Sequence, residues 1–443
     1  MATTYLTRTP SSGAAVQKAT FSFWVKKSNT TGTPNLFRMY TGSTQYVRIR
    51  FEASNKMSFI IINSDSYVVQ LITTQVFTDT SGWYNIVCNL DTTQSTASDR
   101  AKIYVNGEKI TAYDTATYPP TQNASIIITP SGTANNIGAQ VGNSPSFFEG
   151  VMSHVQFTDG YVYEASSFGE TDSETGEWKI NTSPSITYGT NGFFILKDGN
   201  SVTDQSGNSN NFTVGAGTLT KTEDNPSNVF ATLNPLDNFY ASHVFSNGAT
   251  SITTPTSTYS YNTSTLAASA GKFYYEVKIV TLAVDTTIGI AGSVSTGTTY
   301  WLGSSGNIYG YSYTQGGSIY NNNSAIATGY ATYAVGDIVS IAFDLTNNKL
   351  YSGKNGVWNN SANPAGNTGG VSITAASSTT MGAYSPAIGE WSGDAGAYNI
   401  NFGNGYFATT AVASAGTNAS ANGIFEFDVP TGFTALSTKG LNL

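Results

Sequence analysis

The stretch Tyr46-Val-Arg-Ile-Arg-Phe51 alternates strictly between apolar and charged residues. Successive side chains of a β-strand point to opposite faces. Val47, Ile49 and Phe51 would therefore lie on one face, and Arg48 and Arg50 on the other. The stretch predicts a strand with one apolar, buried face.

Similar stretches surround it up to residue 165. Residues 20–25 alternate with one aromatic face, and residues 57–62 form a short apolar run of the length of a buried strand. Asn106-Gly107 is a strong signal for a hairpin turn between two strands. Further strands are predicted at residues 83–90 and 148–157, and no segment longer than two turns has a helical period.

A second series of strands follows later in the chain. Residues 272–279 form its clearest member, and Asn347-Asn348 and Asn355-Gly356 mark hairpin turns. Strands every 8–12 residues with Gly and Asn between them indicate a sandwich. The other strands of this series are predicted at residues 286–292, 308–313, 338–345, 349–352 and 397–402.

The fold class is therefore all-β, with two β-sandwich domains in series. We expect the first sandwich at residues 1–165 and the second at 236–410, joined by an ordered connector with a few short strands at 166–235. In the C-terminal segment, 411–443, residues 424–433 predict a short apolar strand that packs back on an earlier domain.

The composition fits this fold. Charged residues make up 10% of the 443 residues, against about 25% in an average globular protein, and aromatic residues make up 13%. No run of 18 apolar residues occurs, so no membrane insertion is expected. The first eight residues lack the apolar region of a signal peptide. Cys88 is the single cysteine and is expected to be a small buried hydrophobe.

The two halves differ in charge. Residues 1–165 carry 11 basic and 10 acidic side chains, whereas residues 166–443 carry 8 and 17. The acidic second half argues against nucleic acid as a partner, because binding to phosphates needs basic side chains.

No sequence motif for catalysis stands out, so we expect that the protein is not an enzyme and has no catalytic residue. The two histidines, His154 and His243, lie in different predicted domains, and neither a Gly-Lys-Ser/Thr phosphate loop nor a Gly-x-Ser-x-Gly elbow occurs. Glu390 and Asp394 could form the carboxylate pair of a glycosidase. The stronger interpretation is a solvated loop.

No cofactor and no metal centre are expected. Asp91, Asp114 and Asn106 are possible Ca²⁺ ligands, because Ca²⁺ prefers carboxylate and amide oxygens. No clustered acidic loop resembles a dedicated calcium cage, so turn formation is the default role of these residues.

Binding through loops is the function that the residues favour. Loops at the ends of a rigid sandwich commonly carry recognition, and here they pair Tyr and Trp with Asn, Ser and Gly, as antibody loops do. Tyr309, Tyr311 and Tyr313 belong to the same set but could equally form one core face of a strand. Trp301, Trp358 and Trp391 are expected to be exposed. The candidate binding residues are Tyr300, Trp301, Tyr320, Asn322, Trp358, Asn360, Trp391 and Asp394.

Several of these stretches carry a resemblance to known families. The first half resembles a laminin G-like, concanavalin A-like jelly roll, at residues 21–25, 83–87, 103–107 and 148–157. The second half resembles a SPRY domain, at residues 271–277, 288–291, 333–345, 354–357 and 401–403. The whole arrangement resembles bacteriophage tail-fibre-like proteins, at residues 168–171, 188–193, 204–208, 225–236 and 428–433.

The resemblance implies a function. Laminin G-like domains often bind glycans, and SPRY domains bind protein ligands through their loops. We therefore expect a non-enzymatic phage virion surface protein, a tail fibre or receptor-binding component, that recognises host-surface glycan or protein. The alternative is a head-fibre or capsid decoration protein that binds mainly other virion proteins, and a lesser alternative is a polysaccharide-cleaving enzyme. Such a protein would be made in the host cytoplasm and reside in the virion, in contact with other virion structural proteins. Fibres in general suggest a homotrimer.

Overall fold

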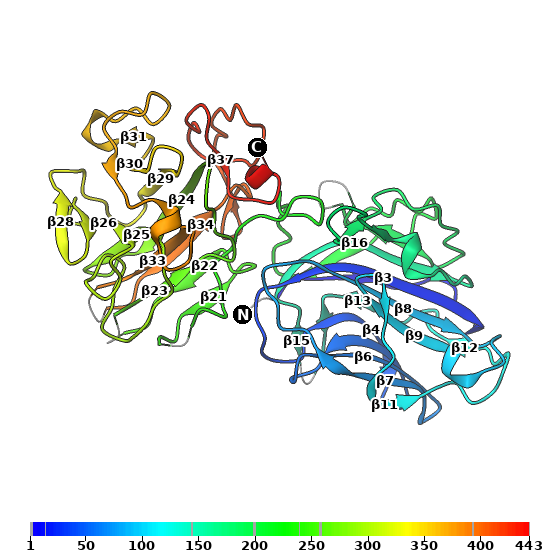
Figure 1. Cartoon of the computed structure of the whole chain (residues 1–443). Coiled ribbons are helices and arrows are strands. Elements are labelled where there is room, and N and C mark those ends of the chain that lie inside the picture. Colours follow the sequence, from blue (N-terminus) through cyan, green and yellow to red (C-terminus); the bar gives the residue numbers. More distant parts are fainter. Residues whose placement is uncertain are drawn as a thin grey trace. The chain divides into compact units, whose positions relative to one another are not determined.

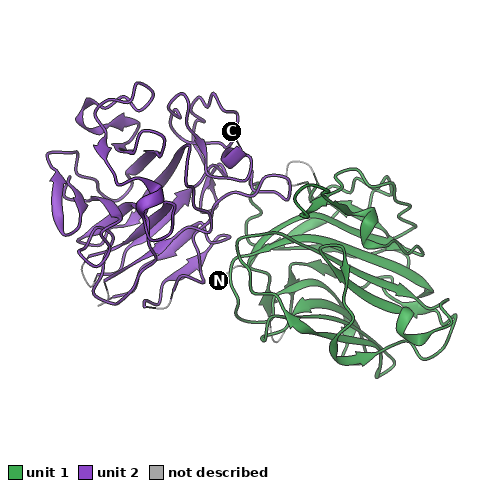
Figure 2. Cartoon of the chain, viewed as in Figure 1, with its two compact units in different colours: residues 1–221 green, residues 222–443 purple. Residues whose placement is uncertain are grey.

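The computed structural model describes residues 3–13, 15–142, 145–197, 201–238, 240–256, 259–391 and 394–442. The chain divides into two compact units, Met1–Lys221 and Thr222–Leu443 (Figure 2). The described residues form strands and short 3-10 turns, which confirms the all-β fold class (Figure 1). None of their helices has the length and hydropathy that crossing a bilayer requires.

The larger sheet of the first unit contains the alternating stretch. This stretch is β5, and Val47, Ile49 and Phe51 are fully buried while Arg48 and Arg50 lie on the other face, as predicted. The sheet has eight strands in the order β11-β7-β6-β5-β4-β13-β1-β20. Their bounds are β1 Tyr5–Arg8, β4 Asn35–Gly42, β5 Gln45–Phe51, β6 Lys56–Asn63, β7 Ser66–Val76, β11 Tyr113–Thr117, β13 Asn135–Ile137 and β20 Thr213–Ala216.

A six-stranded sheet forms the second layer of this unit (Figure 1). The core lies between the layers, where the ring of Phe21 is 4.8 Å from that of Phe37 in the opposite sheet and 4.6 Å from that of Phe157. Cys88 is fully buried, as predicted, and burial raises the pKa of its thiol. The strands, in sheet order, are β10 Glu108–Lys109, β9 Ala101–Val105, β8 Tyr84–Asp91, β3 Lys18–Lys27, β16 Gly150–Asp159 and β19 Phe193–Ile195.

The predicted connector is not a separate body. Its strand β19 pairs with β16, and its strand β20 pairs with β1, so both complete sheets of the first unit. Ala231 and Leu233, near its other end, belong to the core of the second unit. Apolar side chains of this segment are buried in the hydrophobic cores of the two units, each in the core of its own unit. The structure therefore divides the chain at 221/222 instead of at 165 and 235.

The second unit is also a sandwich of two sheets. Its core contains Ile288 and Ile290 from one sheet and Val277, Ile341 and Ile400 from the other. The nine-stranded sheet contains β21 Val244–Ser246, β22 Ser251–Thr253, β34 Ala397–Asn401, β24 Lys272–Thr281, β29 Ile338–Asp344, β30 Lys349–Lys354, β31 Val357–Trp358, β32 Val371–Ser372 and β37 Thr434–Ala435. The six-stranded sheet contains β23 Ser260–Thr263, β33 Ser385–Glu390, β25 Thr286–Ala291, β26 Gly310–Thr314, β27 Ile319–Asn321 and β28 Ser324–Ala327.

The C-terminal segment packs on the nine-stranded sheet without forming the predicted strand over 424–433. Phe425, Val429 and Phe433 are buried there, with the ring of Phe425 4.9 Å from that of Tyr274. The backbone N–H groups of residues 426 and 427 donate to the carboxylate of Glu276, so they are not available to a neighbouring strand. Apart from one isolated bridge between Ile424 and Asn404, this segment pairs with a strand only at β37, which runs parallel to β24.

Short elements complete the described chain. Four two-stranded pairs and five 3-10 turns lie outside the main sheets. The pairs are β2 Ala15–Val16 with β12 Ile126–Ile127, β14 Ala139–Gln140 with β15 Ser146–Phe147, β17 Gly169–Thr171 with β18 Trp178–Ile180, and β35 Tyr406–Phe407 with β36 Thr410–Ala411. The turns are η1 Ala97–Asp99, η2 Ala165–Ser167, η3 Asn359–Ser361, η4 Ala376–Ser378 and η5 Gly440–Asn442.

Candidate functional site

A long loop covers the outer face of the six-stranded sheet in the second unit. Alternation in β25 and β26 directs Ile288, Ile290, Tyr311 and Tyr313 into the core, so the residues between them face outward. The loop that joins these two strands, residues 292–309, returns over that outward face. Its Leu302 packs there in a cluster of its own, with Tyr261, Ala291 and Ala387.

The loop is held by its own polar groups and by close contacts at glycine. Ser293 Oγ lies 2.6 Å from Asn307 Oδ1, and the Ser304 N–H donates to Trp301 O. A β-carbon at Gly306 would lie 2.1 Å from the ring of Tyr300, so only glycine leaves room for that ring. Gly303 has a φ of +104°, and its carbonyl accepts the N–H of Asn323. The loop is therefore a defined structure fixed to the β27–β28 hairpin.

Three aromatic side chains meet at this loop. Trp301 stacks on Trp391 with ring centroids 4.5 Å apart and an interplanar angle of 13°. Tyr320 meets both rings edge-on, at 5.4 Å and 5.3 Å. We call these three residues the aromatic cluster. They come from the β25–β26 loop, from β27 and from the residue after β33, which are far apart in sequence.

The three rings differ in exposure. Trp301 is only 3% exposed, so the expectation that it is solvent-facing was wrong: it is covered by the two rings that it contacts. Trp391 and Tyr320 are half-buried and present part of their rings to solvent. The buried ring therefore supports two rings that a ligand can reach.

Polar atoms lie next to the aromatic cluster. Ser304 Oγ, Asn307 Nδ2 and Ser312 Oγ are buried and have no hydrogen-bond partner among the described residues. A β-carbon at Gly303 would lie about 3 Å from Ser312 Oγ, the Trp301 ring and Tyr320 O together, which places that hydroxyl beside the cluster. These three polar residues were not predicted, since Ser and Asn in a loop give no sequence signal beyond turn formation.

Glu390, the residue before Trp391, is buried and does not lie in a solvated loop. Glu390 ends β33 and is 1% exposed, so the predicted solvated loop was wrong at this residue. Its Oε1 accepts hydrogen bonds from the hydroxyls of Tyr398 and Thr254. Burial raises the pKa of Glu390 to about 8, and the charges of Asp285 and Asp394 add to the effect. Because this carboxyl is enclosed by protein, it is not presented to a ligand on the cluster.

The remaining predicted site residues do not belong to the aromatic cluster. Asn322 is exposed in the β27–β28 turn, with a φ of +48°, and Asp394 and Tyr300 are exposed. Trp358, in β31 of the other sheet, is half-buried against Tyr274, with ring centroids 6.2 Å apart. The exposed residue Asn360 follows it in a 3-10 turn, so neither Trp358 nor Asn360 joins the aromatic cluster. The same alternation that buries Tyr311 and Tyr313 confirms their core interpretation.

The possible calcium ligands are engaged in local structure. Asp91 Oδ2 accepts from Gln94, Asn106 Oδ1 accepts the N–H of Asn85, and Asp114 pairs with Lys56. Among the residues that the structure describes, no three His, Cys, Asp or Glu side chains gather to hold a metal ion.

Both histidines are buried in structural positions. His154 lies at a register shift of β16 with a φ of +47°, and its Nδ1 is 2.7 Å from Ser153 Oγ. His243 Nδ1 is 2.8 Å from Asn238 Oδ1, and burial lowers the pKa of this imidazole to about 4.

Comparison with known proteins supports the first unit's fold. A model of the concanavalin A-like lectin/glucanases superfamily matches residues 2–165. No curated protein matches the chain. The SPRY domain of human HERC1 is 15% identical over 38% of this chain and 96% of its own length, with a TM-score of 0.30. The heptameric SAP-like pentraxin from Limulus polyphemus is 13% identical over 36% and 71%, with a TM-score of 0.26.

The family match confirms a jelly-roll, lectin-like fold for residues 2–165. The two structural similarities are too slight to carry an argument, so the second sandwich rests on its own strands. The bacteriophage assignment stays a prediction.

Proposed function

We propose that this chain is a non-enzymatic recognition protein of a phage virion surface, and that it binds a host-surface glycan or protein through the aromatic cluster. The observation that supports this most is the stacking of Trp301, Trp391 and Tyr320 on one face of the second sandwich. Partly exposed aromatic rings offer a flat apolar surface to sugar C–H groups or to peptide side chains.

The arrangement suits binding because the rings are ordered before a ligand arrives. Trp301 is buried and fixes Trp391, and the loop that carries Trp301 is tied to the β27–β28 hairpin. A preorganised surface loses little side-chain entropy on binding. Asn322, in the turn of the same hairpin, adds an exposed amide for polar groups at the edge of a ligand.

The test is adsorption of the purified full chain to host cells and to isolated host glycans. Trp391→Ala is expected to weaken binding at least tenfold, because a central aromatic anchor typically contributes about 2 kcal/mol or more. Tyr240→Ala, an exposed tyrosine of the same unit that belongs to no aromatic pair described above, is the matched control and should bind as the wild type does.

Other outcomes would overturn the proposal. Equal binding by Trp391→Ala and the wild type would remove the aromatic cluster as the binding surface. Retention on a capsid or tail protein without adsorption to cells or glycans would instead establish a decoration role. Release of sugar fragments from host polysaccharide on long incubation would establish an enzyme.

A further inference from the structure

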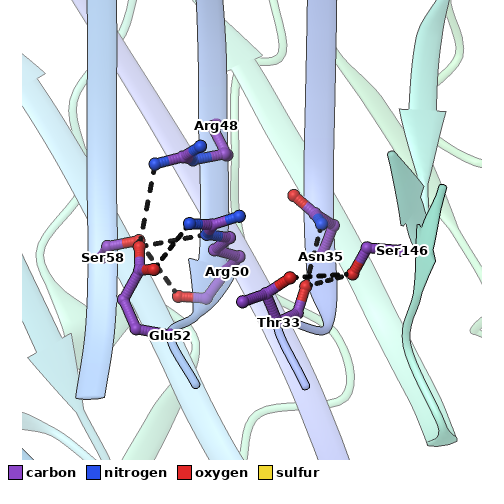
Figure 3. Close-up of polar contacts among 7 residues, drawn as sticks. All are labelled: Thr33, Asn35, Arg48, Arg50, Glu52, Ser58 and Ser146. Atoms are coloured by element: carbon purple, nitrogen blue, oxygen red, sulfur yellow. Dashed lines mark hydrogen bonds and ion pairs between the residues drawn. The ribbon is translucent and has the colours of Figure 1, made fainter. Parts of the chain in front are cut away.

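The outer face of the eight-stranded sheet in the first unit gathers three arginines on neighbouring strands. Arg38 of β4 lies directly opposite Arg48 of β5 in the strand register, and Arg50 lies two residues further along β5. Figure 3 shows Arg48 and Arg50 side by side on this face, with Glu52 and Ser58 beside them. We call Arg38, Arg48 and Arg50 the arginine row. Like charges directly opposite one another destabilise a strand pair, so this placement has an energetic cost.

Among the described residues, Glu52 is the carboxylate that pairs with arginines of this row. Glu52 accepts from Arg50 Nε at 3.0 Å and from Arg50 Nη2 at 2.6 Å, and Ser58 donates to it at 2.7 Å. Its distance to Arg48 Nη2 is 3.8 Å. Glu52 is thus committed mainly to Arg50, and the arginine row keeps a net positive charge.

Arg38 is the member of the row with least compensation. It is 6% exposed, and its guanidinium lies 4.1 Å from the ring centroid of Tyr46 and 4.8 Å from that of Tyr40. Its Nε and Nη1, and the Nε of Arg48, have no hydrogen-bond partner among the described residues. Burial, followed by the charge of Arg48, lowers the pKa of Arg38 to about 10. A buried charge without an anionic partner is costly, and an anion in contact would offset that cost.

A second row, made of three tyrosines and one isoleucine, runs beside the arginine row; we call it the aromatic row. In the strand register Tyr40 lies opposite Tyr46, Tyr46 opposite Ile62, and Ile62 opposite Tyr67, so these residues cross four neighbouring strands on the same face. Tyr40 is 50% exposed and Tyr67 is 47% exposed. The face thus places flat apolar rings next to cationic groups.

We propose that this face binds an acidic saccharide, whose carboxylate lies against Arg48, next to the Arg50 that Glu52 holds, while its ring lies on the exposed tyrosines. The guanidinium fork matches the two oxygens of a carboxylate, and the side chains of Arg48 and Arg50 are 17% and 16% exposed, which leaves them within reach of a ligand. Arg38, opposite Arg48 on the neighbouring strand, contributes charge from a buried position, where low dielectric strengthens its attraction to an anion.

The charge of the whole protein favours a single acidic sugar unit over a long polyanion. The chain has a net charge of −8, and three arginines are too few to neutralise a tract of phosphates. The residue opposite Arg50 on β4 is Asn35, so the row ends with an amide and not with a further cation. Asn35 Nδ2 donates to the Thr33 carbonyl at 3.0 Å (Figure 3).

The test is calorimetric titration of the full chain with a uronic-acid oligosaccharide and, as a matched ligand, with its methyl ester, which lacks the charge. We expect binding of the acid, at least tenfold weaker binding of the ester, and weakening by added salt. Further titrations identify the anionic group that the face prefers. They use oligosaccharides that carry sulfate or phosphate in place of the carboxylate, and inorganic sulfate alone.

Three variants tie the result to this face. Arg48→Gln and Tyr67→Ala alter partly exposed side chains and are expected to weaken binding of the acid at least tenfold. Lys109→Gln removes a charge from the other sheet of the same unit and should leave the affinity unchanged.

Equal affinity for the acid and its ester would overturn the proposal, as would full affinity in both Arg48→Gln and Tyr67→Ala. Tighter binding of a sulfated or phosphorylated oligosaccharide, an acidic peptide or single-stranded DNA than of the uronic acid would overturn the choice of ligand.

Discussion

Replacing Glu276 by glutamine is expected to loosen the C-terminal segment from the second sandwich. The carboxylate is fully buried in β24. Its Oε1 accepts from the Phe427 N–H and the Tyr274 hydroxyl, both at 2.9 Å. Its Oε2 accepts from the Glu426 N–H at 2.9 Å and from Asn401 Nδ2 at 3.2 Å. One side chain thus connects two strands of the sheet to the segment that covers them.

The size of the effect follows from these four bonds. A glutamine amide has one oxygen and one NH₂ group. In one orientation its NH₂ faces two donors, the Glu426 N–H and Asn401 Nδ2; in the other it faces the Phe427 N–H, while the Tyr274 hydroxyl can turn to Ser340 Oγ, 2.9 Å away, and accept. Hydrogen bonds to charged groups contribute about 1.5–3 kcal/mol each. Part of this loss is offset, because the variant buries no ionised group. We therefore expect Glu276→Gln to lower the free energy of unfolding by ~3 kcal/mol, and the Tm by roughly 6–12 °C for a unit of this size.

The assay combines calorimetry with hydrogen exchange. The Tm of the second unit should fall, and the amides of residues 426 and 427 should exchange faster than those in the centre of β24 and β29. Asp394→Asn, at an exposed carboxylate of the same unit, is the control for loss of one charge and should leave both measurements unchanged. An unchanged Tm, or faster exchange spread evenly over the unit, would refute the reasoning.

Three further predictions concern buried groups. Burial raises the pKa of Glu390 to about 8, so the folded state holds this proton at pH values where the unfolded chain has lost it. The stability of the second unit, measured by urea unfolding, should therefore fall as pH rises from about 4.5 to 8, and a rise would contradict this. Trp301→Ala removes a 3% exposed ring and should cost about 3–5 kcal/mol in denaturant unfolding, with a change in the fluorescence of Trp391; a loss below 1 kcal/mol would contradict its buried position. The buried Cys88 thiol, whose pKa is raised, should resist alkylation in the native protein and react after unfolding, and rapid native labelling by mass spectrometry would show otherwise.

Local pattern was sufficient to predict most strands and the fold class. The period-2 alternation at β5 fixes which residues are buried without any knowledge of neighbours, and Asn106-Gly107 specifies its turn through backbone conformation. The segment 424–433 shows where this fails. Its apolar residues are buried as a strand's would be, yet its backbone N–H groups bond to a side chain from β24, and no local pattern reports that partner.

The candidate site was predictable as a set of residue types but not as an arrangement. Loop composition selected Trp301, Tyr320 and Trp391, and the structure brings them into contact. It also selected Trp358, whose neighbours in sequence have a similar composition. This residue packs against Tyr274 of the nine-stranded sheet and does not join the aromatic cluster. Which aromatics meet depends on the path of the β25–β26 loop across the sheet, a non-local feature that the sequence does not reveal.

The arginine row shows most clearly what strand register adds to a sequence. Alternation alone places Arg48 and Arg50 on the outer face, where isolated basic side chains need no explanation. Only the pairing of β4 with β5 sets Arg38 opposite Arg48, and only the β5–β6–β7 pairings carry the aromatic row to Tyr67. A sheet arranged for stability alone gains from opposite charges at facing positions. Here the facing charges are alike, Glu52 is bonded mainly to Arg50, and exposed rings lie alongside. These features together are unfavourable for an unliganded sheet and are those that an anionic sugar requires, which is why we assign the face a ligand and not a role in folding.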